Sequence, residues 1–216
     1  MRKSKTNTIE EMISKIEETR DEYLKVAEDI VKAYHNSVLT PDLFIYGGIE
    51  RAIDITDSFL LLLKWDHFQS AGALLRMHLD TLLRLYALTL VKSKQEFVTA
   101  VMEGKNIDKL EDANGKRLTD SYLRDCFFSA PENKKWINLK EVYTETSGFI
   151  HFSDKHIFAP LKKMDENILS LELGSNLDIP DKSKKEILGA FLMITSAHLA
   201  YLYGWRDLKK SYEDKK

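Results

Sequence analysis

The sequence predicts a mainly α-helical fold, a multi-helix up-and-down bundle of about five long helices. Two observations predict it. Apolar residues recur at three- and four-residue spacings over long stretches of the chain, which is the pattern of helices that bury one face. Capping signals, in which a small polar residue precedes the apolar pattern, stand at the beginning of several of these stretches.

The first two predicted helices have the clearest starting signals. Thr8 and Glu11 have the spacing of a capping box, and Thr40 followed by Pro41 resembles an N-cap with proline at the first helical position. A similar spacing from Ser183 to Glu186 is expected to cap the last helix. In chain order, the predicted helices cover about residues 9–36, 40–64, 66–91, 94–104, 117–129, 130–148 and 183–208.

One segment interrupts the helical pattern. Short apolar runs there are expected to form a β-hairpin or an irregular insertion near residues 155–176. No repeat or linker divides the chain, so residues 1–216 are expected to form a single helical domain. Its two ends, residues 1–7 and 209–216, are expected to fray because they are polar and terminal.

Composition and charge argue against several classes of protein. The 32 basic and 34 acidic residues nearly cancel, so the overall charge gives no reason to expect nucleic-acid binding. Cys126 is the single cysteine and the basic N-terminus lacks an apolar signal segment, so we expect a cytoplasmic protein. The uncharged stretch Ile187–Trp205 is long enough to span a membrane, but Thr195 and His198 within it favour a buried core helix and no membrane.

The central predicted helix carries a charged stripe. Arg76, Asp80 and Arg84 recur every four residues in a leucine-rich segment and therefore share one face, whereas His78 projects away and is expected in the core or an interface. Asp80 can pair with either arginine, which leaves one guanidinium over. That surplus group can join a salt-bridge network with an acidic face of the second helix, or it can bind a phosphate or carboxylate. The acidic face consists of Glu50, Asp54 and Asp57.

A second segment collects polar groups at helical spacing. Tyr143, Ser147 and His151 lie at four-residue intervals, and Ser153 follows them. His151 can act as a general acid or base, which makes it the catalytic candidate, or it can pin the end of the helix by hydrogen bonds. The spacing from His151 to His156 does not fit helical metal ligands, so neither a metal nor a cofactor is expected.

Taken together, the two segments resemble a known group of proteins. The pattern Ala71, Leu74, Arg76 and Asp80, followed by tyrosine, serine, histidine and serine at the spacing seen from Tyr143 onward, resembles uncharacterised bacterial all-helical proteins related to the HEPN (higher eukaryotes and prokaryotes nucleotide-binding) superfamily. The resemblance implies a helical bundle, a homodimer, and a link to RNA cleavage or phage defence. Unlike the catalytic HEPN ribonucleases, this chain has no histidine four to six residues after an arginine.

Three functions follow as hypotheses from these residues and the resemblance. The first is a binding module that holds an anionic small molecule or nucleotide in an interhelical polar pocket. The second is an RNA-directed nuclease or toxin that uses Arg76 and His151. The third is a non-catalytic homodimeric interaction protein with a structural salt-bridge network. The expected ligand-binding residues are Arg76, Asp80, Arg84, Tyr143, Ser147, His151 and Ser153.

Overall fold

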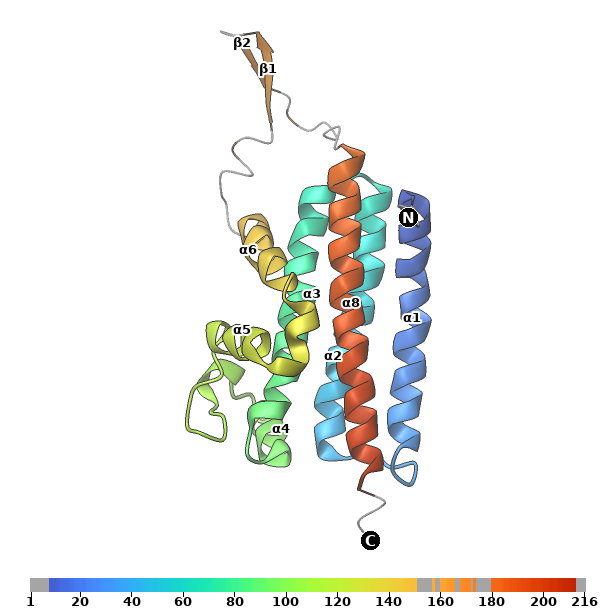
Figure 1. Cartoon of the computed structure of the whole chain (residues 1–216), viewed down its shortest axis with the longest axis vertical. Coiled ribbons are helices and arrows are strands. Elements are labelled where there is room, and N and C mark those ends of the chain that lie inside the picture. The colour runs from blue at the N-terminus through green and yellow to red at the C-terminus, as the bar shows by residue number, and fades with distance from the viewer. Residues whose placement is uncertain are drawn as a thin grey trace.

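The chain folds into a helical bundle, which confirms the predicted fold class. The computed structural model describes residues 8–150, 157, 160–165, 168–171, 173 and 180–212. Its four longest described helices pack in a ring in which α1 contacts α2 and α8, and α3 contacts the same two helices (Figure 1). These helices are α1 (Ile9–Lys32), α2 (Thr40–Lys64), α3 (Phe68–Leu90) and α8 (Asp181–Lys210).

Shorter elements connect α3 to α8 and cover the outer side of α3. They carry the chain back along the bundle, so α8 runs in the same direction as α3 (Figure 1). Both α5 and α6 contact α3, while α4 contacts α2. The connecting elements are α4 (Lys94–Met102), the 3-10 helix η1 (Ile107–Lys109), α5 (Asp120–Ser129), the 3-10 helix η2 (Pro131–Trp136), α6 (Leu139–Ile150), β1 (Leu161–Asp165) and β2 (Ile168–Leu171).

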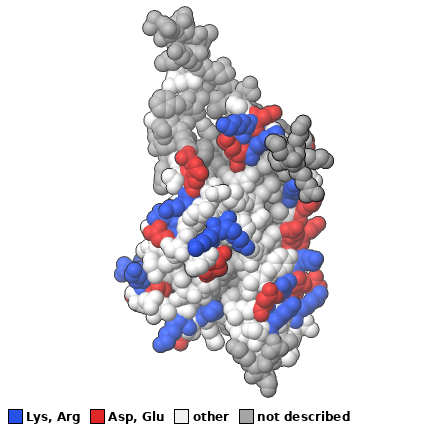
Figure 2. Space-filling view, viewed as in Figure 1, with Lys and Arg blue, Asp and Glu red and all other residues white. Residues whose placement is uncertain are grey.

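The short strands confirm the hairpin expected near residues 155–176. β1 and β2 pair antiparallel with Leu161 opposite Leu171, and the register shifts between Lys163 and Asp165. On the surface of the bundle, positive and negative side chains are interspersed (Figure 2). This mixing matches the near-cancellation of charge in the sequence.

The capping signals predict the start of α1 correctly, but the starts of α2 and α8 differ from the prediction. Thr8 and Glu11 form the expected capping box, with the Thr8 amide 2.9 Å from the Glu11 carboxylate. At α2 the N-cap is Leu39 rather than Thr40, because the Asp42 carboxylate accepts the Leu39 amide instead. The expected Ser183 cap is wrong, since α8 already begins at Asp181, directly after a proline that cannot donate from its nitrogen.

Two predicted helices between α4 and the hairpin have different bounds in the structure. The helix expected from residue 117 begins at Asp120, where the Thr119 side chain accepts the amide of Tyr122. The helix expected over residues 130–148 is divided into η2 and α6, and α6 continues through the glycine at position 148 to Ile150. The helical line of Tyr143 and Ser147 is therefore present in α6.

The prediction that the chain frays from residue 209 is wrong for its first residues. Lys209 is 1% exposed, and its ammonium donates to the carbonyls of Ile30 and Ser37 and to the Asp42 carboxylate, at 2.8, 2.7 and 2.6 Å. Asp42 is fully buried and also accepts the indole N–H of Trp205 at 2.8 Å. This cluster fixes the end of α8 to the turn between α1 and α2, because all three ammonium hydrogens have partners there.

His78 is a core residue, as its position on the helix predicts. It is fully buried, its ring stacks on Phe191 with centroids 4.7 Å apart, and its Nε2 lies 3.0 Å from the Thr195 hydroxyl. His198, also fully buried, donates from Nε2 to the His78 carbonyl at 3.1 Å. Burial lowers the pKa of His78 well below its usual range and lowers the pKa of His198 to about 4. Both imidazoles are therefore neutral at physiological pH.

Helix α8 is the one described helix that is long and apolar enough to cross a membrane, and 44% of its most apolar window is buried inside the bundle. Two polar residues within it, Thr195 and His198, face the core, where Thr195 contacts His78 and His198 contacts its carbonyl. These contacts account for the two polar residues that the sequence singled out in this helix.

Candidate functional site

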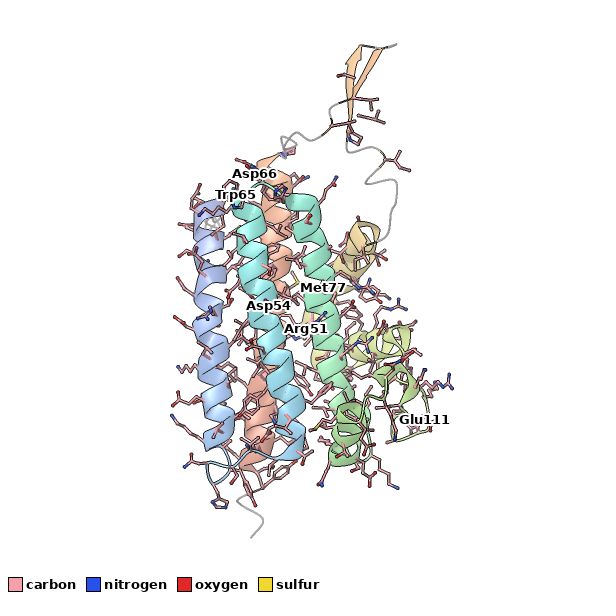
Figure 3. The ribbon with its side chains drawn as sticks, turned by 180° about the vertical axis from the view of Figure 1, so that it is seen from behind. Arg51, Asp54, Trp65, Asp66, Met77 and Glu111 are labelled. Atoms are coloured by element: carbon pink, nitrogen blue, oxygen red, sulfur yellow. The ribbon has the colours of Figure 1, made fainter. Side chains whose placement is uncertain are left out.

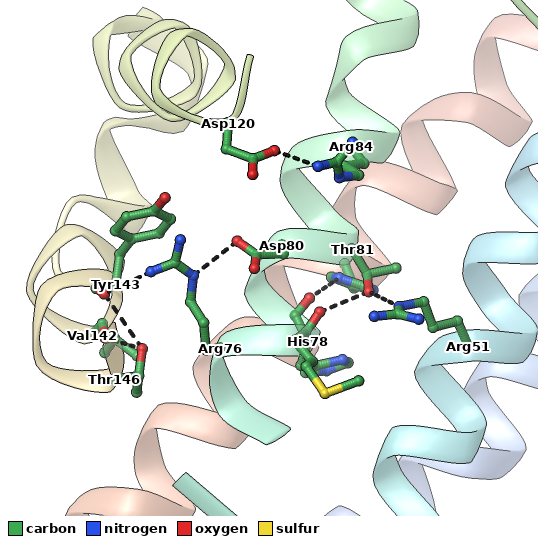
Figure 4. A network of polar contacts seen from close by, with 12 residues as sticks. Arg51, Arg76, His78, Asp80, Thr81, Arg84, Asp120, Val142, Tyr143 and Thr146 are labelled. Atoms are coloured by element: carbon green, nitrogen blue, oxygen red, sulfur yellow. Dashed lines mark hydrogen bonds and ion pairs between the residues drawn. The ribbon is translucent and has the colours of Figure 1, made fainter. Parts of the chain in front are cut away.

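The two segments that the sequence singles out meet in the structure, where α6 packs on α3 (Figure 4). Arg76 donates from Nε to the Asp80 carboxylate at 2.9 Å and from Nη1 to the Tyr143 carbonyl at 3.3 Å. The guanidinium carbon also lies 3.4 Å from the centre of the Tyr143 ring, a close cation–π contact. The Arg76 side chain is only 11% exposed, so these partners enclose it.

Asp80 is influenced in opposite directions by burial and by Arg76. Burial raises the pKa of its carboxyl above the ordinary value, and the nearby Asp120 adds to that effect. The hydrogen bond and charge of Arg76 lower the pKa but do not cancel the effect of burial. Arg76 therefore offsets part of the effect of burial on the pKa of Asp80.

Arg84, the third member of the stripe, forms an ion pair with α5 rather than α2. Its guanidinium lies 2.5 Å from the Asp120 carboxylate, and its side chain is 36% exposed (Figure 4). The predicted acidic face of α2, formed by Glu50, Asp54 and Asp57, is exposed, and Asp57 pairs with Arg20 of α1 at 3.5 Å. The surplus arginine thus has a partner that the sequence pattern did not indicate.

A groove runs beside this stripe between α2, α3 and α4, and we call it the arginine groove. Its volume is about 680 Å³, and its polar end is formed by Arg51, Asp80, Thr81 and Arg84. Gly47 opens onto it, since a Cβ atom there would meet nothing within 4 Å. The apolar part of the lining consists of Leu43, Phe44, Leu85, Val98, Val101, Met102 and Ile107.

Arg51 is the site residue that sequence reasoning missed. It lies on α2 and donates from Nε to the Thr81 hydroxyl of α3 at 3.1 Å (Figures 3 and 4). Within the described ranges no carboxylate pairs with it, whereas Arg76 and Arg84 each have one. The available signal was Gly47 and Gly48 one turn before Arg51, because small residues on a helix allow close approach or leave space. At Gly48 that approach is tight, since a Cβ atom would lie 2.6 Å from Leu85.

Two further expected site residues, Tyr143 and Ser147, lie apart from the groove. Tyr143 and Ser147 are partly buried on α6, on the Arg76 side of α3, and do not line the groove. His151 and Ser153 lie outside the described residues. Among the described residues, no group of three or more histidine, cysteine, aspartate or glutamate side chains is arranged to hold a metal ion.

Fold and site together define a helical-bundle protein with an open interhelical groove that is apolar along most of its length and carries arginines at one end. Comparison with known proteins finds no matching family model, no matching curated protein and no matching solved structure. The function is therefore argued from the geometry of this chain.

Proposed function

We propose that the protein binds a small anionic molecule in the arginine groove. The observation that carries the proposal is the groove itself, about 680 Å³ in volume, with Arg51 and Arg84 at the polar end of an apolar lining. This volume lies in the usual range for small-molecule sites, which combine a mainly apolar wall with a few polar groups that orient the ligand.

The charges around the groove favour a ligand with one negative charge. Arg76 pairs with Asp80, and Arg84 pairs with Asp120. Arg51 donates to a hydroxyl instead, which leaves a surplus of one positive charge. Arg51 carries that surplus, and its terminal nitrogens can donate to both oxygens of a carboxylate. An aliphatic or aromatic carboxylate matches this balance better than a nucleotide, whose phosphate carries more charge.

Arg76 supports binding over catalysis. A nuclease would need its guanidinium beside a phosphate, but Asp80, the Tyr143 carbonyl and the Tyr143 ring already surround it. We therefore assign Arg76 a positioning role, in which it pairs with Asp80 and joins α3 to α6. The relation to HEPN proteins remains a proposal. The ribonuclease activity that this relation would imply is tested by incubating RNA with wild type and with His151→Ala. Equal cleavage of RNA by both proteins, or cleavage by neither, would rule against the ribonuclease hypothesis.

Calorimetric titration with octanoate tests the binding proposal. A parallel titration with adenosine monophosphate tests whether a nucleotide binds instead. Arg51→Met and Arg84→Met should each weaken octanoate binding at least about tenfold, because each removes a hydrogen bond to a charged group. Gly47→Leu should abolish binding by filling the groove, and its Cβ has room to do so. A nucleotide that binds more tightly than octanoate would overturn the preference for a single negative charge.

The matched control is Arg20→Met, which removes an exposed, ion-paired arginine from α1. It should bind octanoate like wild type. If Gly47→Leu also binds like wild type, the groove is not the site.

A further inference from the structure

A second cavity lies between α3, α5, η2 and α8, and we call it the aromatic cleft. Its volume is about 380 Å³, and no residue that lines it also lines the arginine groove. Rings from four elements form its walls, and small residues of α8 line it as well. The rings belong to Tyr86, Phe127, Trp136, Tyr201 and Trp205.

Several of these rings are held in place by contacts outside the cleft. The Tyr201 hydroxyl donates to the Leu85 carbonyl at 2.6 Å, and the Trp205 indole donates to Asp42 at 2.8 Å. Tyr86 and Phe127 pack edge to face with centroids 5.2 Å apart. Walls fixed in this way lose little conformational freedom when a ligand binds, which favours affinity.

On α8 the cleft is open at two small residues, although Ala197 and Trp205 in its lining are buried in the core. Ala200 and Gly204 are exposed and line the cleft one helical turn apart, and a Cβ atom at Gly204 would meet nothing within 4 Å. Figure 2 shows uncharged surface over the front of the bundle, interrupted near its middle by a group of positive and negative side chains. The accessible part of the aromatic wall belongs mainly to Trp136 and Tyr201, since the other three rings that line the cleft are buried.

The rim of the cleft carries charges that select among aromatic molecules. Lys94 and Lys135 line it, and in the described part of the chain neither forms an ion pair with a carboxylate. Lys135 lies 4.9 Å from the Trp136 ring, close to the aromatic wall. Glu132 adds one negative charge at the rim, and Asn133 is fixed there by a hydrogen bond to the Phe127 carbonyl. The net charge of the rim is positive.

We propose that the aromatic cleft is a second ligand site and that it takes a small aromatic carboxylate. The ring of the ligand would pack against the aromatic walls, and its carboxylate would be held by Lys94 or Lys135 at the rim. A free aromatic amino acid and a simple aromatic acid share this chemistry. They differ in the ammonium group, for which Glu132 is the available partner.

Tryptophan fluorescence tests the proposal, because two of the three tryptophans, Trp136 and Trp205, line the cleft. Titration with 3-phenylpropionate should change the emission saturably, and phenylalanine should do so at least as well if Glu132 takes part. Phenethylamine, which lacks the carboxylate, should bind at least about tenfold more weakly. Equal binding of the amine and the acid would overturn the assignment.

Gly204→Leu should weaken 3-phenylpropionate binding at least about tenfold by filling the cleft. Leucine also has the higher helix propensity, so the melting temperature should not fall. Ala200→Leu, one turn earlier, is the second variant that fills the cleft. Gly47→Leu, which fills only the arginine groove, should leave this titration unchanged. The proposals for the two sites can therefore be tested independently. Unchanged affinity in both Gly204→Leu and Ala200→Leu would refute the site.

Discussion

Two charged clusters in this bundle differ in how completely they are paired. Asp42 and Lys209 are buried at one end of the bundle, and every hydrogen of the ammonium group has a partner. Arg51 and Arg84 lie at the edge of the arginine groove, where Arg84 is about one-third exposed and Arg51 donates only from Nε to a hydroxyl. A closed cluster is expected to stabilise the fold, and an open cluster is available to bind a ligand.

The largest effect is expected from breaking the closed cluster. Lys209→Met leaves the Asp42 carboxylate buried without its cation, which should lower the free energy of unfolding by about 3–5 kcal/mol. Urea denaturation measures this loss. Lys210→Met is the matched control, since Lys210 is exposed, and it should change the stability by less than about 0.5 kcal/mol. Similar stabilities for the two variants would show that the closed cluster is not needed for folding.

The buried histidines give the next largest effect, as a dependence of stability on pH. The pKa of His198 is about 4 in the folded protein and near 6.5 when the chain unfolds, so the unfolded chain binds the extra proton first as the pH falls. Stability should therefore decrease from about pH 6.5 down to about pH 4, and His198 alone contributes a loss of about 2 kcal/mol between pH 7 and pH 5. His78, whose pKa is also lowered by burial, adds to this loss.

Chemical denaturation at a series of pH values checks this dependence. His198→Gln retains an N–H that can donate to the His78 carbonyl but cannot titrate in this range, so it should make the curve less steep, while the contribution of His78 remains. An equally steep curve in that variant would show that His198 does not contribute to the dependence of stability on pH.

A smaller effect is expected at the contact between α3 and α6. Arg76→Met and Tyr143→Leu should each lower stability by about 1–2 kcal/mol, because each removes the cation–π contact and Arg76→Met also removes the bond to Asp80. A double-mutant cycle should show a coupling energy of about 1 kcal/mol. Additive losses would indicate that the two side chains do not stabilise each other.

The smallest effect on stability is expected at the open cluster. Arg51→Met should change the free energy of unfolding by less than about 0.5 kcal/mol, since Arg51 is exposed and donates a single hydrogen bond, to the Thr81 hydroxyl. Thermal unfolding with and without octanoate distinguishes a role of Arg51 in ligand binding from a role in stabilising the fold. The ligand should raise the melting temperature of wild type and much less that of Arg51→Met. A strong loss of stability without ligand would make Arg51 a structural residue like Lys209.

The same comparison explains what the sequence could predict. The repeat of Arg76, Asp80 and Arg84 is local, so the helix and its stripe were predictable, and the segment at Tyr143, which the sequence also indicates, contacts the stripe through Arg76. The partners of Arg84 and Lys209 depend on how distant helices pack. Lys209 follows an apolar helix near the chain end, where a lysine ordinarily faces solvent, and nothing in its neighbourhood indicates the buried Asp42.

The central claim is that the arginine groove holds a small anion, and methionine methyl NMR tests it most directly. Met102 lines the groove, while Met12 belongs to the core and Met193 lies between α6 and α8. On titration with octanoate the Met102 methyl signal should shift saturably, the Met12 and Met193 signals should stay in place, and Arg51→Met should need at least about tenfold more ligand. A Met102 signal that does not move, or that moves equally in wild type and Gly47→Leu, would contradict the account.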